Sequence, residues 1–292
     1  MKGIYIVNNI VNKKIFIDIL TKLQKKELNK VKLSLDYEYN YRKIGLCQVM
    51  INSKEVNKIF LFIPSYFSNR EQQLIKDTIY LSKYKKILHG SESLDIPYIY
   101  GMLGNKKDII KFTSKLYDIF IYEVYEYITR FMCDQVKLLG QKCSLYEGLV
   151  NTKTITKDDY DNLMKIYNRN PNLYKLHWNV NNMPKDAYLY AAFDVLYLKK
   201  FYKNLTKYPE NLIINDISRL IFLERNNITH IIKNNSVNKK LVEKYKKSNL
   251  LGIKIDYFRN YIIQIYAICK QDKKIINYIS ELGLKKLANY LS

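Results

Sequence analysis

Two acidic residues one position apart, Asp36 and Glu38, lie where a strongly apolar stretch of the chain ends. Apolar residues alternate with others over 31–35, a pattern typical of a half-buried strand. The apolar run 44–51 follows after a short polar connection, as the second strand of a hairpin would. Carboxylates beside a dry core raise the free energy of folding unless a cation neutralises them. A divalent metal ion is the usual cation, so the pair predicts a metal site at the end of this strand.

The charge balance of the chain favours a polyanionic partner, which is either nucleic acid or an anionic membrane surface. Lysine and arginine outnumber acidic residues 49 to 27, a net charge of +22 over 292 residues. No run of about 18 uncharged apolar residues occurs, so no membrane-spanning helix is expected. The N-terminus also lacks the apolar run of a secretory signal. The four cysteines show no paired metal spacing and are expected to be reduced thiols. We expect an intracellular protein that is located in the cytoplasm or the nucleus. If the protein is viral, a viral factory is a further expected location.

The hydrophobic pattern predicts an α/β fold with a mixed sheet. Strands are expected at 4–7, 31–35, 45–51, 58–63, 86–89 and 116–118. Helices are expected over 13–26, 70–82, 157–166 and 185–204, with others opening near residue 95 and running from 119 to 132. A boundary is predicted near Tyr208-Pro209, followed by basic helices over 210–224, 238–247, 253–270 and 273–290. We therefore expect an α/β domain over 1–207 and a helical, basic C-terminal region over 208–292.

Two further acids stand where they can join the first pair. Asp95 follows a predicted strand near the start of a helix, and Asp194 lies within a predicted helix. Tyr190 precedes Asp194 by four residues, so the two side chains share one helical face. Four carboxylates can hold two Mg²⁺ ions about 3.5–4 Å apart, which is the arrangement that phosphodiester hydrolysis requires. With an unperturbed pKa of about 10, the tyrosine hydroxyl would orient an attacking water rather than act as a base.

Three segments resemble, in order, the motifs of the DEDD exonucleases of the ribonuclease H-like superfamily. They are LDYE, HGSESLD and YLYAAFDVLYL. The tyrosine four residues before the last aspartate is similar to the DEDDy branch, which includes ribonuclease D and the Werner-type exonucleases. The resemblance covers about residues 1–205. GLCQV in the second strand, LHG before the second motif and Leu176-His177-Trp178 ahead of Met183-Pro184 also fall in the order of that family.

The resemblance implies a ribonuclease H-like fold with a mixed five-stranded sheet flanked by helices. The helical basic C-terminal extension expected from the residue pattern follows that fold. It also implies a 3′-to-5′ exonuclease that releases nucleoside 5′-monophosphates from single-stranded or frayed 3′ ends of RNA or DNA. By that similarity Asp36, Glu38, Asp95 and Asp194 bind two divalent cations, Mg²⁺ or alternatively Mn²⁺, and Tyr190 positions the water. The aspartate of the second motif lies one residue farther from His89 than in the family, which leaves Glu92 as the alternative ligand.

Other interpretations of the same residues remain open. The leading alternative is a catalytically silent RNA- or DNA-binding protein of the same fold, and a weaker one is a protein recruited to a membrane surface by its lysines. His89 is expected to pack at the end of its strand rather than bind metal. His177 and Trp178 are candidates for stacking on a base, and Trp178 equally for a core position. Asp118 is expected to be structural rather than a ligand.

Overall fold

The computed structural model describes residues 3–41, 43–91, 94–118, 145–169, 176–207, 210–248, 250 and 256–292. The chain folds into two compact units, and each unit combines two segments that are separate in the sequence. The first unit combines residues 1–91 with 141–204, and the second combines 92–140 with 205–292. The chain enters the second unit for the last time after residue 204, and residues 92–140 group with the C-terminal region in that unit. The expected domains, 1–207 and 208–292, remain a prediction. In the described residues no helix is both long and apolar enough to cross a membrane.

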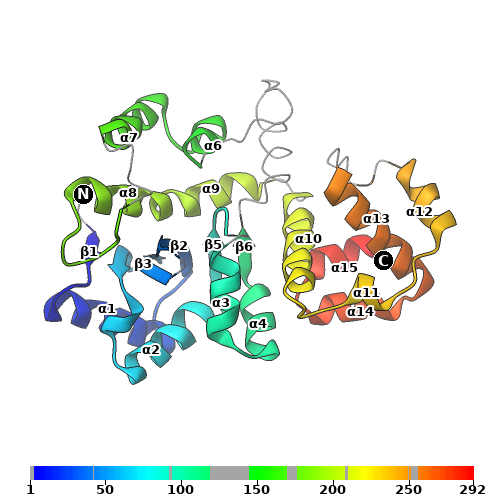
Figure 1. Cartoon of the computed structure of the whole chain (residues 1–292), viewed down its shortest axis with the longest axis horizontal. Helices are drawn as coiled ribbons and strands as arrows, with labels where there is room; N and C mark the ends of the chain where they lie inside the picture. The colour runs from blue at the N-terminus through cyan, green and yellow to red at the C-terminus, as the bar shows by residue number, and fades with distance from the viewer. Residues whose placement is uncertain are drawn as a thin grey trace. The chain divides into compact units, whose positions relative to one another are not determined.

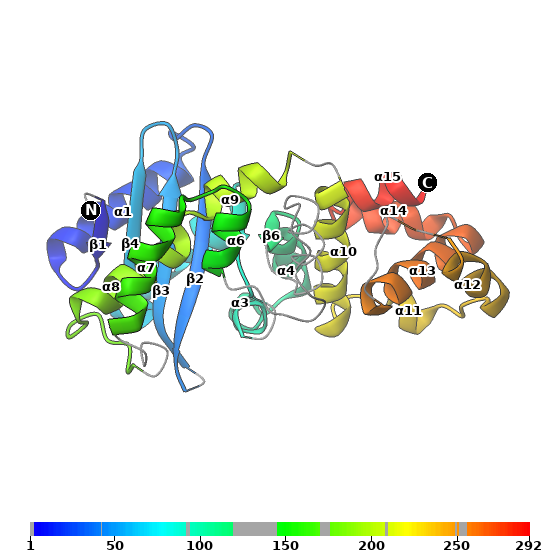
Figure 2. The ribbon, with the colours of Figure 1, turned by 90° about the horizontal axis from the view of Figure 1, so that it is seen from above.

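The first unit is built on a mixed sheet whose strands follow the order β1-β4-β3-β2-β5. β2 pairs antiparallel with β3 and β3 with β4, while β1 and β5 run parallel to their neighbours (Figure 2). The bounds are β1 Ile4–Ile6, β2 Lys32–Asn40, β3 Lys43–Asn52, β4 Asn57–Phe62 and β5 Lys85–Leu88. The strands expected in this unit are therefore all present, and a sixth, β6 (Leu116–Asp118), falls in the second unit. The chain thus has one strand more than the five-stranded sheet expected.

Helices cover both faces of this sheet (Figure 1). On one face Phe16 of α1 packs between Phe60 and Phe62 of β4, with ring centroids 4.7 and 5.0 Å apart. On the other face α8 packs on β2, β3 and β4. The helices of this unit are α1 Ile10–Gln24, α2 Asn69–Ile75, α6 Leu145–Asn151, α7 Lys157–Arg169, α8 Lys185–Leu196 and α9 Leu198–Leu205. A 3₁₀ turn at Pro64–Tyr66 and a π turn at Lys76–Tyr80 complete it.

Strand β2 is longer than the apolar pattern predicts. The pattern places the end of the strand before Asp36, but the strand continues to Asn40 because β3 pairs with it along its whole length. A bulge between Glu38 and Tyr39 shifts the register only near the tip of the hairpin. Both acidic residues therefore lie inside a paired strand, and that pairing fixes the positions of their backbones.

The second unit is mostly helical. Its elements are α3 Asp95–Leu103, α4 Lys106–Thr113, β6, α10 Glu210–Arg225, α11 Ile231–Asn234, α12 Lys239–Lys246, α13 Asp256–Gln271, α14 Lys274–Glu281 and α15 Lys285–Leu291. The single helix expected over 273–290 is in fact two, because Gly283 adopts a left-handed φ of 81° between α14 and α15. The helix expected over 119–132 lies outside the described residues.

Buried polar groups join the two segments of the second unit. Arg219 of α10 donates to the carbonyl oxygens of Thr113 (3.2 Å), Ser114 (2.7 Å) and Gly283 (3.3 Å). It also forms a buried ion pair with Asp216. The hydroxyl groups of Thr113 and of Tyr100 in α3 lie 2.6 Å apart. Since a buried polar group without a partner costs about 1–3 kcal/mol, these bonds tie the C-terminal helices to α3 and α4.

Backbone packing next to the sheet is tight at Gly45 of β3. A Cβ at this position would lie 2.7 Å from Asn40 Nδ2 and 2.8 Å from Trp178 Cβ. The Asn40 side chain cannot move aside easily, because it donates to the Trp178 carbonyl (2.9 Å) and accepts from the Trp178 amide (2.7 Å). Gly45→Ala is therefore expected to destabilise the protein by about 1–3 kcal/mol.

Thermal unfolding followed by circular dichroism measures this effect. Gly101→Ala is the matched control, because a Cβ at Gly101 meets nothing within 4 Å and alanine favours the helix. A melting temperature that is unchanged in Gly45→Ala would contradict the packing described here.

Candidate metal centre

The antiparallel pairing of β2 and β3 sets the direction of the first two carboxylates. Successive side chains on a strand point to opposite faces, so Asp36 and Glu38 share one face of the sheet. Leu35 and Tyr37, which alternate with them, are buried against the other face. The alternating apolar residues therefore anchor the strand and aim both acids toward the face that α8 covers.

Helix α8 positions the third carboxylate. Ala187, Ala191 and Ala192 are fully buried in an apolar cluster with residues of β3 and β4, which include Leu46 and Leu61. Small side chains in this row let the helix axis come close to the strands. Asp194 lies between the buried residues 193 and 195, and one of its carboxylate oxygens lies within 4.8 Å of oxygens of Asp36 and Glu38 on β2.

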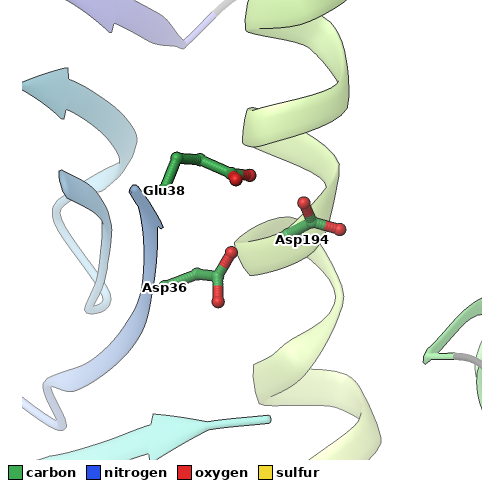
Figure 3. A group of neighbouring side chains, drawn as sticks. All are labelled: Asp36, Glu38 and Asp194. Carbon is green, nitrogen blue, oxygen red and sulfur yellow. The ribbon is translucent and has the colours of Figure 1, made fainter. Parts of the chain in front are cut away.

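Asp36, Glu38 and Asp194 converge on one point. One carboxylate oxygen from each of the three residues lies within 4.8 Å of the other two. Figure 3 shows Asp36 and Glu38 extending from the strand toward the helix that carries Asp194. All three side chains are half-buried. Such a group of hard oxygen donors suits a divalent cation such as Mg²⁺ or Mn²⁺.

Neighbouring polar side chains support this carboxylate group. Gln48, opposite Asp36 on β3, donates from Nε2 to Glu38 Oε1 at 3.2 Å. Its Oε1 is buried without a hydrogen-bond partner in the described part of the chain. Tyr146 of α6 donates its hydroxyl to Asp194 Oδ1 at 2.8 Å. Sequence reasoning missed both residues: the hairpin register would have indicated Gln48, but no sequence signal indicates Tyr146.

The electrostatics of the group reflect three negative charges held close together. Burial raises the pKa of Asp194 to about 7, and the hydrogen bond from Tyr146 opposes part of this rise. The negative charge of Asp194, followed by burial and the charge of Glu38, raises the pKa of Tyr190 well above its usual value. The Tyr190 hydroxyl therefore stays protonated at neutral pH and acts as a hydrogen-bond donor.

Aromatic rings hold Tyr190 in place on α8. Its ring stacks on Trp178 at 6.4 Å with an interplanar angle of 24°, and Tyr167 of α7 lies 6.3 Å away. Trp178 is 2 % exposed and belongs to the apolar cluster under α8, so it is a core residue and cannot stack on a base. His177 beside it is exposed.

The remaining candidates are not members of this carboxylate group in the part of the chain that the structure describes. Asp95 begins α3 in the second unit, is buried, and is not a member of the group of three carboxylates. Its alternative, Glu92, lies outside the described residues. Burial lowers the pKa of His89 to about 4, so this residue is neutral at pH 7, as expected for a packed residue after β5. Asp118 is buried in β6.

The chain is similar in sequence to a viral protein. No protein-family model matches the chain. The sequence is 31% identical to Uncharacterized protein L533 of Acanthamoeba polyphaga mimivirus, over 76% of this chain and 48% of that protein. The chain thus spans about half the length of this relative.

Among solved structures, RNase D of Trypanosoma brucei in complex with GMP superposes with a TM-score of 0.50 at 15% identity, covering 76% of this chain and 63% of that chain. RNase D from the same organism in complex with RNA U12 gives a TM-score of 0.46 at 17% identity, covering 76% and 70%. The superposition with the GMP complex shows that the chain has the ribonuclease H-like fold expected from the three motifs, and the likeness to ribonuclease D is one of fold.

The raised pKa of Asp194 makes the stability of the metal-free protein depend on pH. Between pH about 4 and about 7 the folded state holds a proton that the unfolded chain releases, so stability falls as pH rises through this window. Asp194→Asn removes the buried charge. In EDTA, the melting temperature of this variant relative to wild type is expected to rise between pH 5 and pH 8.

Asp18→Asn on α1 is the control, because Asp18 is an exposed carboxylate outside the group. Its melting temperature relative to wild type should not change between these pH values. A constant difference for Asp194→Asn as well would show that Asp194 carries no charge penalty.

Proposed function

We propose that the chain is a metal-dependent 3′-to-5′ exonuclease that removes nucleoside 5′-monophosphates from the 3′ end of a nucleic acid. The observation that carries this proposal is the convergence of Asp36, Glu38 and Asp194 within 4.8 Å, with Tyr190 one helical turn before Asp194. Carboxylates so close together repel each other, and burial raises the pKa of Asp194 to about 7. A divalent cation removes this penalty.

The donor set fits divalent ions. Three carboxylates provide hard oxygen atoms at one place, and Gln48 fixes one of them by donating to Glu38 Oε1. We assign Asp36, Glu38 and Asp194 as ligands of divalent ions, Mg²⁺ with Mn²⁺ as a substitute. Asp95 as the fourth ligand, and with it a pair of ions, is what the resemblance to the DEDD exonucleases implies. When bound, such ions lower the pKa of the attacking water and neutralise the leaving oxygen.

The protein's own groups position the reactants. Hydrolysis forms a bond between a water oxygen and the phosphorus, and the bond from phosphorus to the 3′ oxygen breaks, that oxygen leaving with a proton. The protonated Tyr190 hydroxyl donates a hydrogen bond that orients the water. Trp178 and Tyr167 fix the ring that carries this hydroxyl. Tyr146 fixes Asp194 in turn.

Further observations support a nucleic-acid substrate. The net charge of +22 suits a polyanion. The structurally similar RNase D was crystallised with GMP, a nucleoside monophosphate such as this reaction would release. Cys47 and Cys269, the cysteines within the described residues, are buried and form no disulfide, which supports the proposed intracellular location.

Loss of either carboxylate of β2, that of Asp36 or that of Glu38, should greatly slow cleavage. Asp36→Asn and Glu38→Gln are expected to lower kcat/KM on a 5′-labelled oligonucleotide in Mg²⁺ by about 1,000-fold, since each removes several kcal/mol of charge stabilisation. Gel analysis should show wild type shortening the oligonucleotide stepwise from its 3′ hydroxyl end and not from a blocked 3′ end. Single-stranded and recessed substrates of RNA and DNA should be compared.

Glu27→Gln serves as the control, because Glu27 is exposed and outside the group. Binding without metal-dependent cleavage by wild type would instead identify a silent nucleic-acid-binding protein. Full activity in Asp36→Asn would refute the proposed metal centre.

The two tyrosines near Asp194 should have separable effects. Tyr146→Phe removes the hydrogen bond to a ligand and is expected to weaken Mn²⁺ binding by about 10- to 100-fold. Tyr190→Phe leaves the carboxylates unchanged and should lower kcat by about 100-fold by misplacing the water. Isothermal titration with Mn²⁺ and single-turnover cleavage measure the two quantities. Equal loss of metal affinity in both variants would contradict these roles.

A further inference from the structure

Four lysines of the first unit lie close together, and we call them, with Tyr202, the lysine cluster: Lys32, Lys85, Lys199 and Lys203. The ammonium groups of Lys32 and Lys85 lie 4.4 and 5.5 Å from the centroid of the Tyr202 ring. A cation over an aromatic face is attracted by the ring quadrupole. The tyrosine therefore holds the two strand lysines side by side.

The sheet register and helix α9 bring the lysine cluster together. Lys32 begins β2 and pairs with Lys85 on β5 and with Asn52 on β3, so these three residues form one row across the sheet. Lys199 of α9 donates from Nζ to Asn52 Oδ1, which places it over the same row. Lys203 follows one helical turn later and is exposed.

Lys32, Lys199 and Lys203 concentrate positive charge at one place. Burial, then the charge of Lys199, then that of Lys203 lower the pKa of Lys32. In the part of the chain that the structure describes, none of Lys32, Lys199 and Lys203 forms an ion pair with a carboxylate. Like charges held together raise the free energy of the folded state, and a bound anion relieves this repulsion.

The lysine cluster lies on the same face of the sheet as the carboxylates. Asp36 lies four positions after Lys32 on β2, which corresponds to about 13 Å along the strand. Side chains four residues apart on a strand point to the same side. A nucleic-acid strand with its 3′ end at Asp36 therefore needs only a short extended stretch to reach Lys32.

We propose that the lysine cluster is a binding subsite for a backbone phosphate of the nucleic-acid strand, upstream of the bond that is cleaved. This inference rests on the proposed nuclease function. Lys32 and Lys85 are half-buried over the Tyr202 ring, and the half-buried Lys199 is hydrogen-bonded to Asn52. They therefore form a compact, fixed site that suits one or two phosphates. A membrane surface would require lysines that are freely exposed on a broad face, and only Lys203 meets that condition.

Binding to a 12-nucleotide single strand tests the subsite. The variant Lys32→Gln/Lys199→Gln/Lys203→Gln is made in the Asp36→Asn full-length protein, and fluorescence anisotropy is measured in Ca²⁺ between 50 and 300 mM salt. For each phosphate that the variant no longer binds, affinity should fall about fivefold at 0.1 M salt and the salt slope should become less steep by about 0.7. The control Lys14→Gln/Lys22→Gln/Lys25→Gln removes the same charge from exposed positions on and beside α1, which covers the opposite face.

Cleavage of substrates of different length supplies the second measurement. A dinucleotide with free 5′ and 3′ hydroxyl groups has a single phosphate, which lies at the cleaved bond, so no phosphate remains for the lysine cluster. With Asp36 intact, the triple variant should lose kcat/KM on the 12-mer and retain it on the dinucleotide. Lys203→Glu, a single exposed change, should give the same pattern if the triple variant does not fold, and Lys203→Arg should restore wild-type behaviour.

Three results would overturn the subsite. They are equal losses for the lysine-cluster variant and the α1 control, equal losses on both substrate lengths, and reduced binding to phosphatidylserine vesicles with unchanged oligonucleotide affinity. Failure of the nuclease proposal is distinguishable from these. In that case wild type cleaves neither substrate, while the anisotropy measurement still reports whether the lysines bind the strand.

Discussion

The mutual repulsion of three carboxylates is the interaction around which the first unit is organised. The β2–β3 hairpin supplies two of them on one face, and α8 supplies the third only because alanines let the helix lie close to the sheet. The favourable burial of the apolar cluster under α8 offsets the unfavourable approach of the charges. The packing of neighbouring residues thus stabilises the site, since contacts among the three carboxylates are unfavourable. Gln48, Tyr146 and the aromatic stack around Tyr190 belong to those surroundings.

The two ends of the sheet face that α8 and α9 cover differ in charge. Acidic side chains gather toward the end of β2, and lysines gather at its beginning. A phosphodiester strand is negatively charged throughout, so it is attracted by the basic end directly and by the acidic end only through cations. This polarity would give a bound strand one preferred direction, which an enzyme that acts at a single kind of terminus requires.

Local patterns predicted the parts of the fold that local interactions determine. The strands follow from alternating apolar residues, and Asp36, Glu38, Tyr190 and Asp194 follow from short motifs whose spacing sets a shared face. Properties that depend on distant contacts were missed. The pattern could not show that β3 extends β2 to Asn40, or that Tyr146 reaches Asp194 from another helix. The place of Trp178 in the core likewise depends on two hydrogen bonds between its backbone and the side chain of Asn40, 138 residues earlier.

The polar connection through Arg219 has a consequence for how the chain can be divided. Tyr100 lies on α3, the helix that Asp95 begins, and its hydroxyl is bonded to Thr113, whose carbonyl accepts from Arg219. Arg219 in turn contacts Gly283, near the end of the chain. The C-terminal helices therefore stabilise α3, the helix that Asp95 begins, through this chain of hydrogen bonds. A protein that ends at residue 207 would lack Arg219, so the end of α4 would lose the hydrogen bonds that Arg219 donates to the carbonyl oxygens of Thr113 and Ser114.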